Sequence, residues 1–504
     1  MSKTEFFTQT AKALDYRSAA KWLLISLLVV LSAMFFGLVA VTGNYLIVAV
    51  AAGLLLGGLL VAKPDWNITL IIVVGSLSGF ATSLLGPSLS KISWGVSMLG
   101  FLLWIPAAIG LVTTRRVPLF VWLSIAFVLY ATAVTVTQWY SLSEFAAGFK
   151  RYFQAIALLF ALGTLAFTPD DFRRWKKIML GIALLQLPFA LYELLILVPE
   201  RGGLAAGGDV TDVVAGSFGA NLTGGSANAE MATFLLIAYG FLFSRWREKQ
   251  LTGNTLLLLT PFLLAPLFMG ETKIVVVMLP LVGFILLRDD LRHNPGRFAL
   301  FTLLGSGLLI SVAAFYALFI DQDTFHTALR DTIKYNFQNQ GYGSNVLNRM
   351  SVLTFWWQQQ GLSDPVGFFF GHGLGSSFTA GLGGVISGHI SASFPGYGID
   401  LTTASTLLWD LGVIGLLLYL AILALAWFAA NHLYKNSIDP LVRADALAIQ
   451  AAIALFALFI VYRNSPLNFM PWEIIIYMTL GYLSYLYRMN GVAPERQPRH
   501  RPSF

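Results

Sequence analysis

The chain has 504 residues, of which 57% are hydrophobic and only 11% charged, and its formal net charge is +7. This apolar excess is larger than a soluble core needs, so the composition excludes a water-soluble protein. The absence of cysteine excludes disulfides, thiolate metal sites and a cysteine nucleophile.

Apolar runs long enough to cross a bilayer as helices recur from Trp22 almost to the end of the chain. They predict an all-α polytopic membrane protein with helices near residues 22–41, 45–62, 68–85, 92–112, 117–136, 152–167, 178–198, 227–243, 256–268, 274–287, 298–320, 406–430, 446–461 and 472–485. The ninth and tenth are short and are joined by Gly270-Glu271-Thr272-Lys273. This pair either spans the membrane or dips in and returns, so we expect about 12 to 14 transmembrane helices.

The positions of the cations predict how the chain lies in the membrane. With the amino end in the cytoplasm, most of the 32 Lys and Arg residues fall in cytoplasmic segments, as the positive-inside rule expects. We therefore expect a bacterial inner-membrane protein with both termini cytoplasmic. Its parts are helices 1–11 over residues 1–320, a large periplasmic loop over 321–405, helices 12–14 over 406–488 and a basic cytoplasmic tail over 489–504. The loop includes an expected amphipathic helix, Ser344–Gln360, along the membrane surface.

Some cations do not follow this pattern, and carboxylates accompany them on the expected periplasmic side. The cations are Lys91, Lys150, Arg151, Arg201, Lys273, Arg330, Lys334, Arg349 and Arg463, and the carboxylates are Glu144, Glu193, Glu230, Glu271, Asp400, Asp410 and Glu473. Charge at the membrane edge is costly and is usually paired or functional. The set is therefore either a group of structural ion pairs and side chains that reach water, or a cationic binding site.

A cationic, partly dehydrated site at the periplasmic leaflet suits a polyanion, because arginine binds phosphate through two parallel hydrogen bonds. Nucleotide sugars and ATP are not expected there, so the substrate must carry its own activation, as a polyprenyl diphosphate does. Sugar transfer from such a lipid needs no metal: cations stabilise the departing diphosphate, and a carboxylate or imidazole takes the acceptor's proton. We expect no cofactor, no metal and no nucleic-acid partner.

The expected periplasmic loop contains Gly371-His372-Gly373-Leu374-Gly375-Ser376-Ser377. This run is similar to a phosphate-cradling turn, and it also fits a tight turn before a flexible linker. Histidines of the same loop, His326, His372 and His389, lack the close spacing of metal ligands.

Several short motifs resemble the O-antigen polymerase and ligase superfamily. They are Arg349 with Trp356-Trp357, the run Phe370-Gly371-His372-Gly373-Leu374-Gly375-Ser376, the Gly-x-x-Gly pair in Thr406 to Gly415 and, more loosely, Gly216 to Asn221 with Asn228 to Glu230. The resemblance extends from about Lys150 to Leu483. It implies a GT-C-like fold and the transfer, with inversion, of a glycan from undecaprenyl diphosphate to an acceptor.

The resemblance also suggests roles for residues. Ligases place a histidine roughly eleven residues before the first glycine of the Gly-x-x-Gly pair, where this chain has Leu401. This departure favours a polymerase, with Asp400 or His389 as the base. The expected site consists of Arg349, Asp400, His389 and His372 for catalysis, Lys150, Arg151, Lys273, Arg330 and Arg463 for the diphosphate, and Glu230, Glu271, Asp410 and Trp356 for the rest of the substrate.

The sequence therefore predicts a Wzy-type polymerase that joins lipid-linked repeat units into O-antigen, capsule or exopolysaccharide. Undecaprenyl-diphosphate-linked glycan would be both donor and acceptor, in contact with membrane lipids, and family analogy suggests a chain-length regulator as a partner. One alternative is an O-antigen or protein O-glycosylation ligase, which uses a different acceptor. Another is a secondary transporter or lipid-linked glycan flippase, although the chain shows no clear internal repeat of the kind that transporters carry.

Overall fold

The structure is a computed structural model that describes residues 37, 56–85, 92–114, 116–200, 213–221, 225–270, 272–319, 330, 334, 341, 345–379 and 387–490. The chain divides into two compact units, residues 1–67 and 68–504. In the first unit, residues 56–62 and 64–67 are helical. Within the described ranges the chain forms helices and no strands. All of the expected helix at 22–41 except residue 37, most of that at 45–62, Glu271 and the tail beyond 490 lie outside the described residues.

Six helical segments are long and apolar enough to cross a membrane, judged by length and composition. They are Pro64–Ser83 in α3 (Pro64–Leu85), Ile92–Thr113 with α4 (Ile92–Leu102) and α5 (Trp104–Thr113), α6 (Leu119–Thr137), Pro169–Glu200 beginning with α9 (Pro169–Tyr192), α19 (Thr403–Asn436) and α20 (Pro440–Tyr462). A bent pair, α7 (Leu142–Phe153) and α8 (Ile156–Thr164), adds a seventh if it crosses as one span, with 50° between its halves. The expectation of an all-helical, multi-pass membrane protein is confirmed at this level.

The described residues show fewer clear spans than the sequence predicts. Further expected spans do form helices: α11 (Asn228–Arg247), α12 (Gly253–Met269), α13 (Val275–His293), α14 (Pro295–Phe319) and α21 (Met470–Asn490). α12 has only 17 residues, and α11 begins with Glu230 in its first turn and ends with two arginines. Short length and charged ends therefore leave these two helices without the apolar run that marks a membrane crossing by itself.

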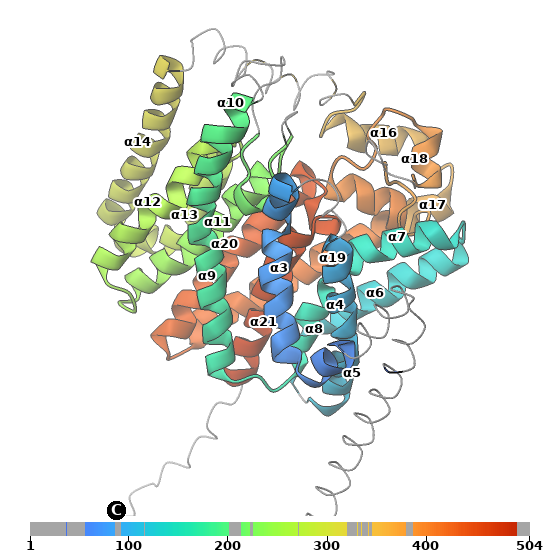
Figure 1. Cartoon of the computed structure of the whole chain (residues 1–504), viewed down its shortest axis with the longest axis horizontal. Coiled ribbons are helices and arrows are strands. Elements are labelled where there is room, and N and C mark those ends of the chain that lie inside the picture. The colour runs from blue at the N-terminus through green and yellow to red at the C-terminus, as the bar shows by residue number, and fades with distance from the viewer. Residues whose placement is uncertain are drawn as a thin grey trace, which may run out of the picture. The chain divides into compact units, whose positions relative to one another are not determined.

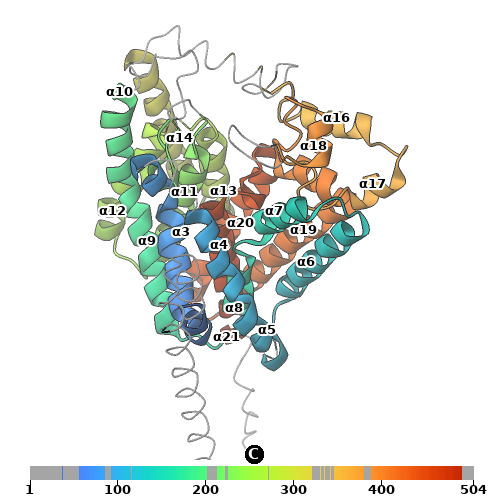
Figure 2. The ribbon, with the colours of Figure 1, turned by 45° about the vertical axis from the view of Figure 1, so that its right-hand side comes forward.

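The centre of the second unit is formed by α20, which is far more buried than the other spans. Inside the molecule, 78% of its apolar window is buried, against 33% to 44% for the other five. α11, α13 and α19 pack against α20, and α8, all of whose residues are buried, packs against α21. The short helices α16 (Ser351–Gln359), α17 (Pro365–Phe370) and α18 (His389–Ser393) gather near one end of α19, close to α7 (Figures 1 and 2).

α19 is interrupted inside its length at Gly412, which has φ 66° and ψ −170°. The backbone of Phe369, at the end of α17, crosses α19 here so closely that a Cβ at Gly412 would clash with it. Gly371 meets the backbone of Asp410 in the same way. The Gly-x-x-Gly pair, Gly412 and Gly415, lies within α19, which begins at Thr403.

The expected amphipathic helix Ser344–Gln360 is shorter in the structure and begins at Ser351. Residues 346–347 instead form backbone hydrogen bonds with residues 396–397. The side-chain oxygen of Asn348 accepts the amide hydrogens of Met350 and Ser351, at the point where α16 begins. Trp356 is buried in a small apolar cluster with α19, so the apolar side of this helix packs on protein.

Candidate functional site

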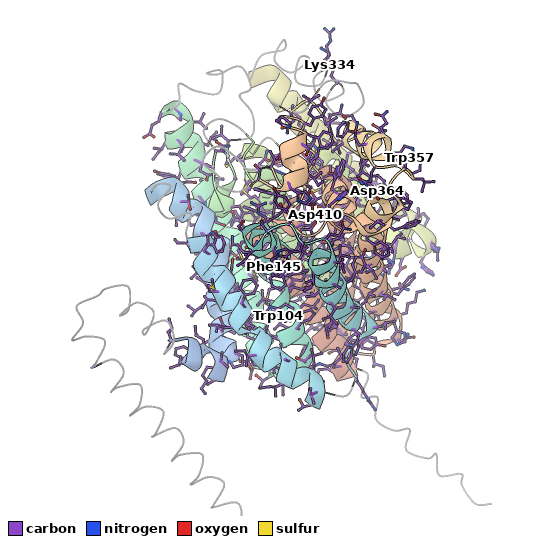
Figure 3. All side chains as sticks on the ribbon, turned by 90° about the vertical axis from the view of Figure 1, so that its right-hand side faces the viewer. Trp104, Phe145, Lys334, Trp357, Asp364 and Asp410 are labelled. Carbon is purple, nitrogen blue, oxygen red and sulfur yellow. The ribbon has the colours of Figure 1, made fainter. Side chains whose placement is uncertain are left out.

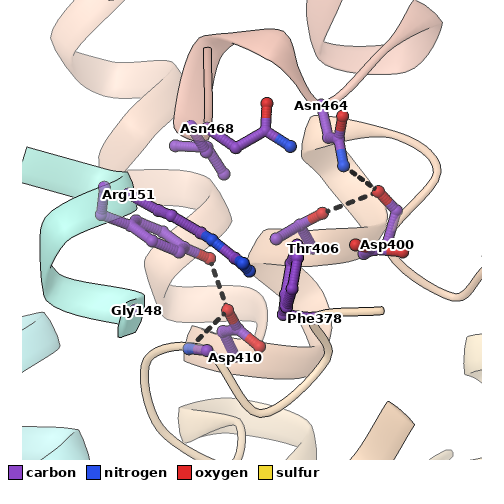
Figure 4. Close-up of a pocket in the computed structure, with 11 residues that line it drawn as sticks. Gly148, Arg151, Phe378, Asp400, Thr406, Asp410, Asn464 and Asn468 are labelled. Carbon is purple, nitrogen blue, oxygen red and sulfur yellow. Dashed lines mark hydrogen bonds between the residues drawn. The ribbon is translucent and has the colours of Figure 1, made fainter. Parts of the chain in front are cut away.

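A small pocket lies where α7, the start of α19 and the segment after α20 meet (Figure 4). Its lining residues are Gly148, Arg151, Tyr152, Gly375, Phe378, Asp400, Thr406, Asp410, Asn464, Leu467 and Asn468. The pocket has a volume of about 20 Å³, which leaves room for roughly one water molecule. Figure 3 shows Asp410 toward the part of the bundle that carries Trp357 and Asp364, away from Trp104 of α5. Of the residues predicted from sequence, the pocket brings together Arg151, Asp400 and Asp410.

α7 presents three of the site's residues on one face. The Ser141 side chain caps the helix by accepting the amide hydrogen of Glu144 at 3.2 Å. Glu144, Gly148 and Arg151 follow at spacings of four and three residues, so they line up along the helix. The backbone at Leu374 crosses α7 at Gly148, where a Cβ would lie 2.5 Å from the Leu374 carbonyl. This crossing requires glycine and fixes the distance between α7 and the loop.

Arg151 is the cation of the pocket. Its guanidinium lies over the ring of Phe378, and it interacts electrostatically with Asp400 and Asp410. Its Nη1 atom is buried and has no hydrogen-bond partner among the described residues. A buried donor without an acceptor costs about 1–3 kcal/mol, and more when the group is charged. A bound anion would supply the missing acceptor for this nitrogen.

The carboxylate of Asp410 accepts four hydrogen bonds from other groups of the protein. The donors are the hydroxyls of Tyr152 at 2.9 Å and Ser376 at 2.8 Å, and the amide hydrogens of Gly375 at 3.1 Å and Ser377 at 2.8 Å. The glycine-rich run that was predicted as a phosphate cradle or a tight turn is therefore a turn whose amides hold an internal carboxylate. The amides of Gly375 and Ser377 are thus already bonded to Asp410.

Asp400 is the second carboxylate of the pocket. Its Oδ2 accepts the amide hydrogen of Thr379 at 3.1 Å. Burial raises the pKa of Asp400 to about 6, although that hydrogen bond and the positive charge of Arg151 act in the opposite direction. The backbone carbonyl of Asp400 accepts the side-chain amide of Asn464, which connects the start of α19 to the segment after α20.

Two further predicted cations, Arg349 and Arg463, lie at the end of α20. Arg463 Nη1 lies 3.2 Å from Glu230 Oε2 and donates to the carbonyl of Ser226 at 3.0 Å. Arg349 Nε donates to the carbonyl of Tyr462 at 2.8 Å, and its guanidinium lies 4.2 Å from the centre of that ring. Neither arginine lines the pocket, but both lie next to the chain segment that carries its asparagines.

The remaining predicted site residues lie elsewhere. The Lys150 ammonium lies 4.6 Å from the centre of the Trp94 ring on α4. Lys273 is exposed in the turn before α13, and Arg330 is also exposed. Trp356 is buried in the apolar cluster beside α19. None of these four lines the pocket, so the structure does not bring them together with Arg151.

A second polar group lies beside the same loop. His389 Nδ1 lies 2.9 Å from Glu144 Oε1, its amide hydrogen is donated to Glu144 Oε2 at 2.8 Å, and its ring stacks on Tyr140. His372 Nε2 lies 3.0 Å from Gln360 Oε1. Burial lowers the pKa of His372 below its ordinary 6.5, so this imidazole is neutral at pH 7.

Sequence reasoning did not assign roles to several residues that form the site. These are Tyr140, Tyr152, Phe378, Asn464 and Asn468, and Glu144 was named only as one of several carboxylates. The spacing of Glu144, Gly148 and Arg151 on one helix face is a signal that was present in the sequence. The aromatic and asparagine residues had no such local signal, because they reach the pocket through contacts between distant segments.

The described residues contain no group of three or more histidine, aspartate or glutamate side chains that could hold a metal ion. The arrangement offers one incompletely bonded guanidinium, two buried carboxylates and a carboxylate-bound imidazole, which suit anion binding and proton transfer. A comparison with known protein families finds no matching family model, and a comparison with curated proteins finds no matching relative.

Proposed function

We propose that this chain is an inner-membrane glycosyltransferase of GT-C-like fold that polymerises undecaprenyl-diphosphate-linked repeat units at the periplasmic face. The observation that carries the proposal is the buried guanidinium of Arg151, whose Nη1 has no hydrogen-bond partner in the described structure, in a pocket shared with two carboxylates. A phosphate oxygen would supply the missing acceptor, because guanidinium groups form strong charge-assisted bonds with phosphate.

The two ends of α20 support the proposed orientation. Near its first turns, Asp445 binds Arg245 of α11 and Lys176 of α9, and other cations assigned to the cytoplasm lie on the same turns of those helices. The positive-inside rule assigns such an end to the cytoplasm. The pocket residue Asn464 follows the opposite end of α20, about 25 Å further along the helix axis. The pocket would then face the periplasm.

The proposed reaction is an inverting displacement. The acceptor hydroxyl oxygen forms a bond to the anomeric carbon of the donor glycan while the bond from that carbon to the diphosphate oxygen breaks. The electron pair of that bond leaves with the polyprenyl diphosphate, and the guanidinium of Arg151 stabilises the charge that develops there. The acceptor's proton passes to a base of the protein. No metal and no nucleotide take part in this scheme.

The pocket must widen to admit a diphosphate, because its present volume is about 20 Å³. The ring of Phe378 covers the guanidinium of Arg151, so this ring has to move before phosphate can bind. Phe378 is followed by Thr379 and then by residues outside the described ranges. Donor binding would thus exchange an aromatic contact of Arg151 for a charge-assisted hydrogen bond, which is the stronger interaction in a dehydrated site.

The experiment uses the purified full chain in lipid nanodiscs with a polyprenyl-diphosphate-linked repeat unit, without added metal or nucleotide. We expect longer lipid-linked glycans and release of polyprenyl diphosphate. Arg151→Met is expected to lower kcat/KM at least about 100-fold, the usual loss when a group that stabilises developing negative charge is removed. Lys177→Met, which removes an exposed cation of α9, is the matched control and should retain wild-type activity.

The alternatives predict different products. A ligase would leave the lipid-linked chains unlengthened and transfer them to lipid A core or protein, and deletion of its gene would leave full ladders detached from core. Deletion of a polymerase gene would leave single repeat units. Movement of the lipid-linked unit across the bilayer, without any elongation by the wild-type chain, would overturn the proposal in favour of a flippase.

A further inference from the structure

Glu144 and His389 form a contact of a kind used to orient a base. Both oxygens of the Glu144 carboxylate accept from His389, one from the backbone amide at 2.8 Å and one facing Nδ1 at 2.9 Å. The carboxylate is buried, with 6% of its side chain exposed, whereas 23% of the imidazole is exposed. A carboxylate on Nδ1 fixes the tautomer and orientation of the ring, which leaves Nε2 free to accept a proton.

The imidazole of this pair is partly exposed, and the tyrosine that stacks on it is exposed. Nε2 of His389 has no hydrogen-bond partner among the described residues. The ring stacks on Tyr140 with the centroids 4.5 Å apart, and Tyr140 itself is 65% exposed. A molecule from solution can therefore reach both the imidazole and the exposed tyrosine.

The pair belongs to the same helix face as the cation of the pocket. Glu144 and Arg151 are seven residues apart on α7, which places them about 10 Å apart along the helix axis. The loop that crosses α7 between them at Gly148 also links the two groups, because Gly388 donates its amide hydrogen to the carbonyl of Phe378 at 2.9 Å. One sugar ring with its phosphoryl group can bridge such a separation.

We propose that His389 is the base that takes the proton of the acceptor hydroxyl, and that Glu144 is the residue that positions it. This inference rests on the proposed function. As the acceptor oxygen bonds to the anomeric carbon, its proton passes to Nε2 of His389, and the imidazolium that forms is stabilised by the Glu144 carboxylate. The diphosphate departs at the Arg151 side with the electron pair of the broken bond. The acceptor is then a saccharide hydroxyl that approaches over Tyr140.

The experiment measures elongation by the full chain in nanodiscs, with donor binding measured separately. His389→Gln, which keeps the backbone contact and a side-chain donor for Glu144, should lower kcat by about 100-fold or more, as expected for loss of a general base. The KM for the donor should stay within about twofold, because the proposed base acts only in the transition state and does not contribute to binding of the donor. His389→Ala should lose activity in the same way, and added imidazole should restore part of it.

Glu144→Gln distinguishes positioning from simple structural support. In the wild-type background it should lower kcat, and in the His389→Ala background it should have no further effect, because the two residues act as one unit. Thermal unfolding of each variant checks that the chain remains folded. Wild-type rates in His389→Gln, or additive losses in the double variant, would overturn the inference while the proposed function stands. Absence of elongation by the wild-type chain would overturn both.

Discussion

Two buried charge clusters lie at opposite ends of α20, and they differ in how completely their charges are bonded. At the first end, the Asp445 carboxylate accepts hydrogen bonds from Nε and Nη2 of Arg245 at 2.7 and 2.8 Å and from the hydroxyl of Tyr482. The ammonium of Lys176 lies 3.4 Å from the same carboxylate. At the other end, Arg151 lies near two carboxylates, yet its Nη1 has no acceptor in the described structure. The Asp445 cluster is closed, in the sense that its charges are fully hydrogen-bonded, whereas the Arg151 cluster lacks an acceptor for one guanidinium nitrogen.

The two clusters contrast a fully hydrogen-bonded ion pair with a buried cation that keeps an unsatisfied donor. Proteins rarely leave a buried donor unsatisfied without compensation. The Asp445 cluster joins α9, α11, α20 and α21 through complete hydrogen bonding, as expected for a group that holds helices together. The Arg151 cluster has a surplus donor beside a pocket. The two clusters therefore differ in hydrogen bonding and not in charge, and only the Arg151 cluster combines an unsatisfied guanidinium with a pocket.

The largest expected effect tests this contrast directly. Arg245→Met should lower the free energy of unfolding by about 3–5 kcal/mol, because it leaves the buried Asp445 without its bidentate partner. The matched variant, Arg151→Met, should change stability by less than about 1 kcal/mol, since Asp410 keeps its four internal hydrogen bonds and an unsatisfied donor is removed. Denaturant unfolding of both proteins in the same detergent measures the two values.

The activity of the same two variants should show the reverse order. Arg151→Met should be folded and inactive, whereas any Arg245→Met protein that remains folded should elongate glycans. If Arg151→Met were the less stable of the two, the Arg151 cluster would be structural and the contrast between the ends would disappear.

The second prediction concerns the pH dependence of stability. The pKa of Asp400 is raised by burial to about 6, so the folded protein binds this proton more tightly than the unfolded chain does. The stabilisation is present in full below about pH 4 and is lost as the pH rises through about 6. It amounts to about 3 kcal/mol, from 1.36 kcal/mol for each pH unit between the two pKa values. Unfolding of the wild-type chain and of Asp400→Asn between pH 4 and 7 measures it.

The comparison between these two proteins isolates one carboxyl group. The wild-type curve should fall relative to the Asp400→Asn curve over this range, and the two should run parallel above about pH 7. Parallel curves throughout would mean that Arg151 neutralises Asp400 in the folded protein. The Arg151 cluster would then be an ion pair, as closed as the cluster around Asp445.

Much of the helical fold could be predicted from the sequence, because a long apolar run is a local signal. The expected spans at 68–85, 117–136 and 446–461 overlap α3, α6 and α20, with shifts of a few residues at their ends. The irregular parts were not predictable in this way. The break of α19 at Gly412 follows from the crossing of Phe369, a contact between segments that no window of neighbouring residues contains.

The same division holds for the candidate site. The sequence identified Arg151, Asp400 and Asp410 because charged residues are rare in an apolar chain and stand out individually. It could not show that the amides of the glycine-rich turn are occupied by Asp410, since the partners are 33 to 35 residues apart. It also named Lys150 and Arg151 together, whereas adjacent positions on a helix point in different directions, and only Arg151 faces the pocket.

The smallest expected effect concerns Gly148, which lies between Glu144 and Arg151 on α7. A Cβ at this position would lie 2.5 Å from the backbone carbonyl of Leu374, so Gly148→Ala should cost about 1–3 kcal/mol by overpacking. Gly181→Ala in α9 is the matched control, because nothing lies within 4 Å of its Cβ and alanine favours a helix by about 0.5–1 kcal/mol. Thermal unfolding compares both with the wild-type chain.

Gly148→Ala should also slow elongation, since displacement of the loop alters the spacing between Arg151 and the Glu144–His389 pair. A Gly148→Ala protein as stable and as active as wild type would show that the loop can withdraw from α7, and the two groups would then not depend on a fixed separation.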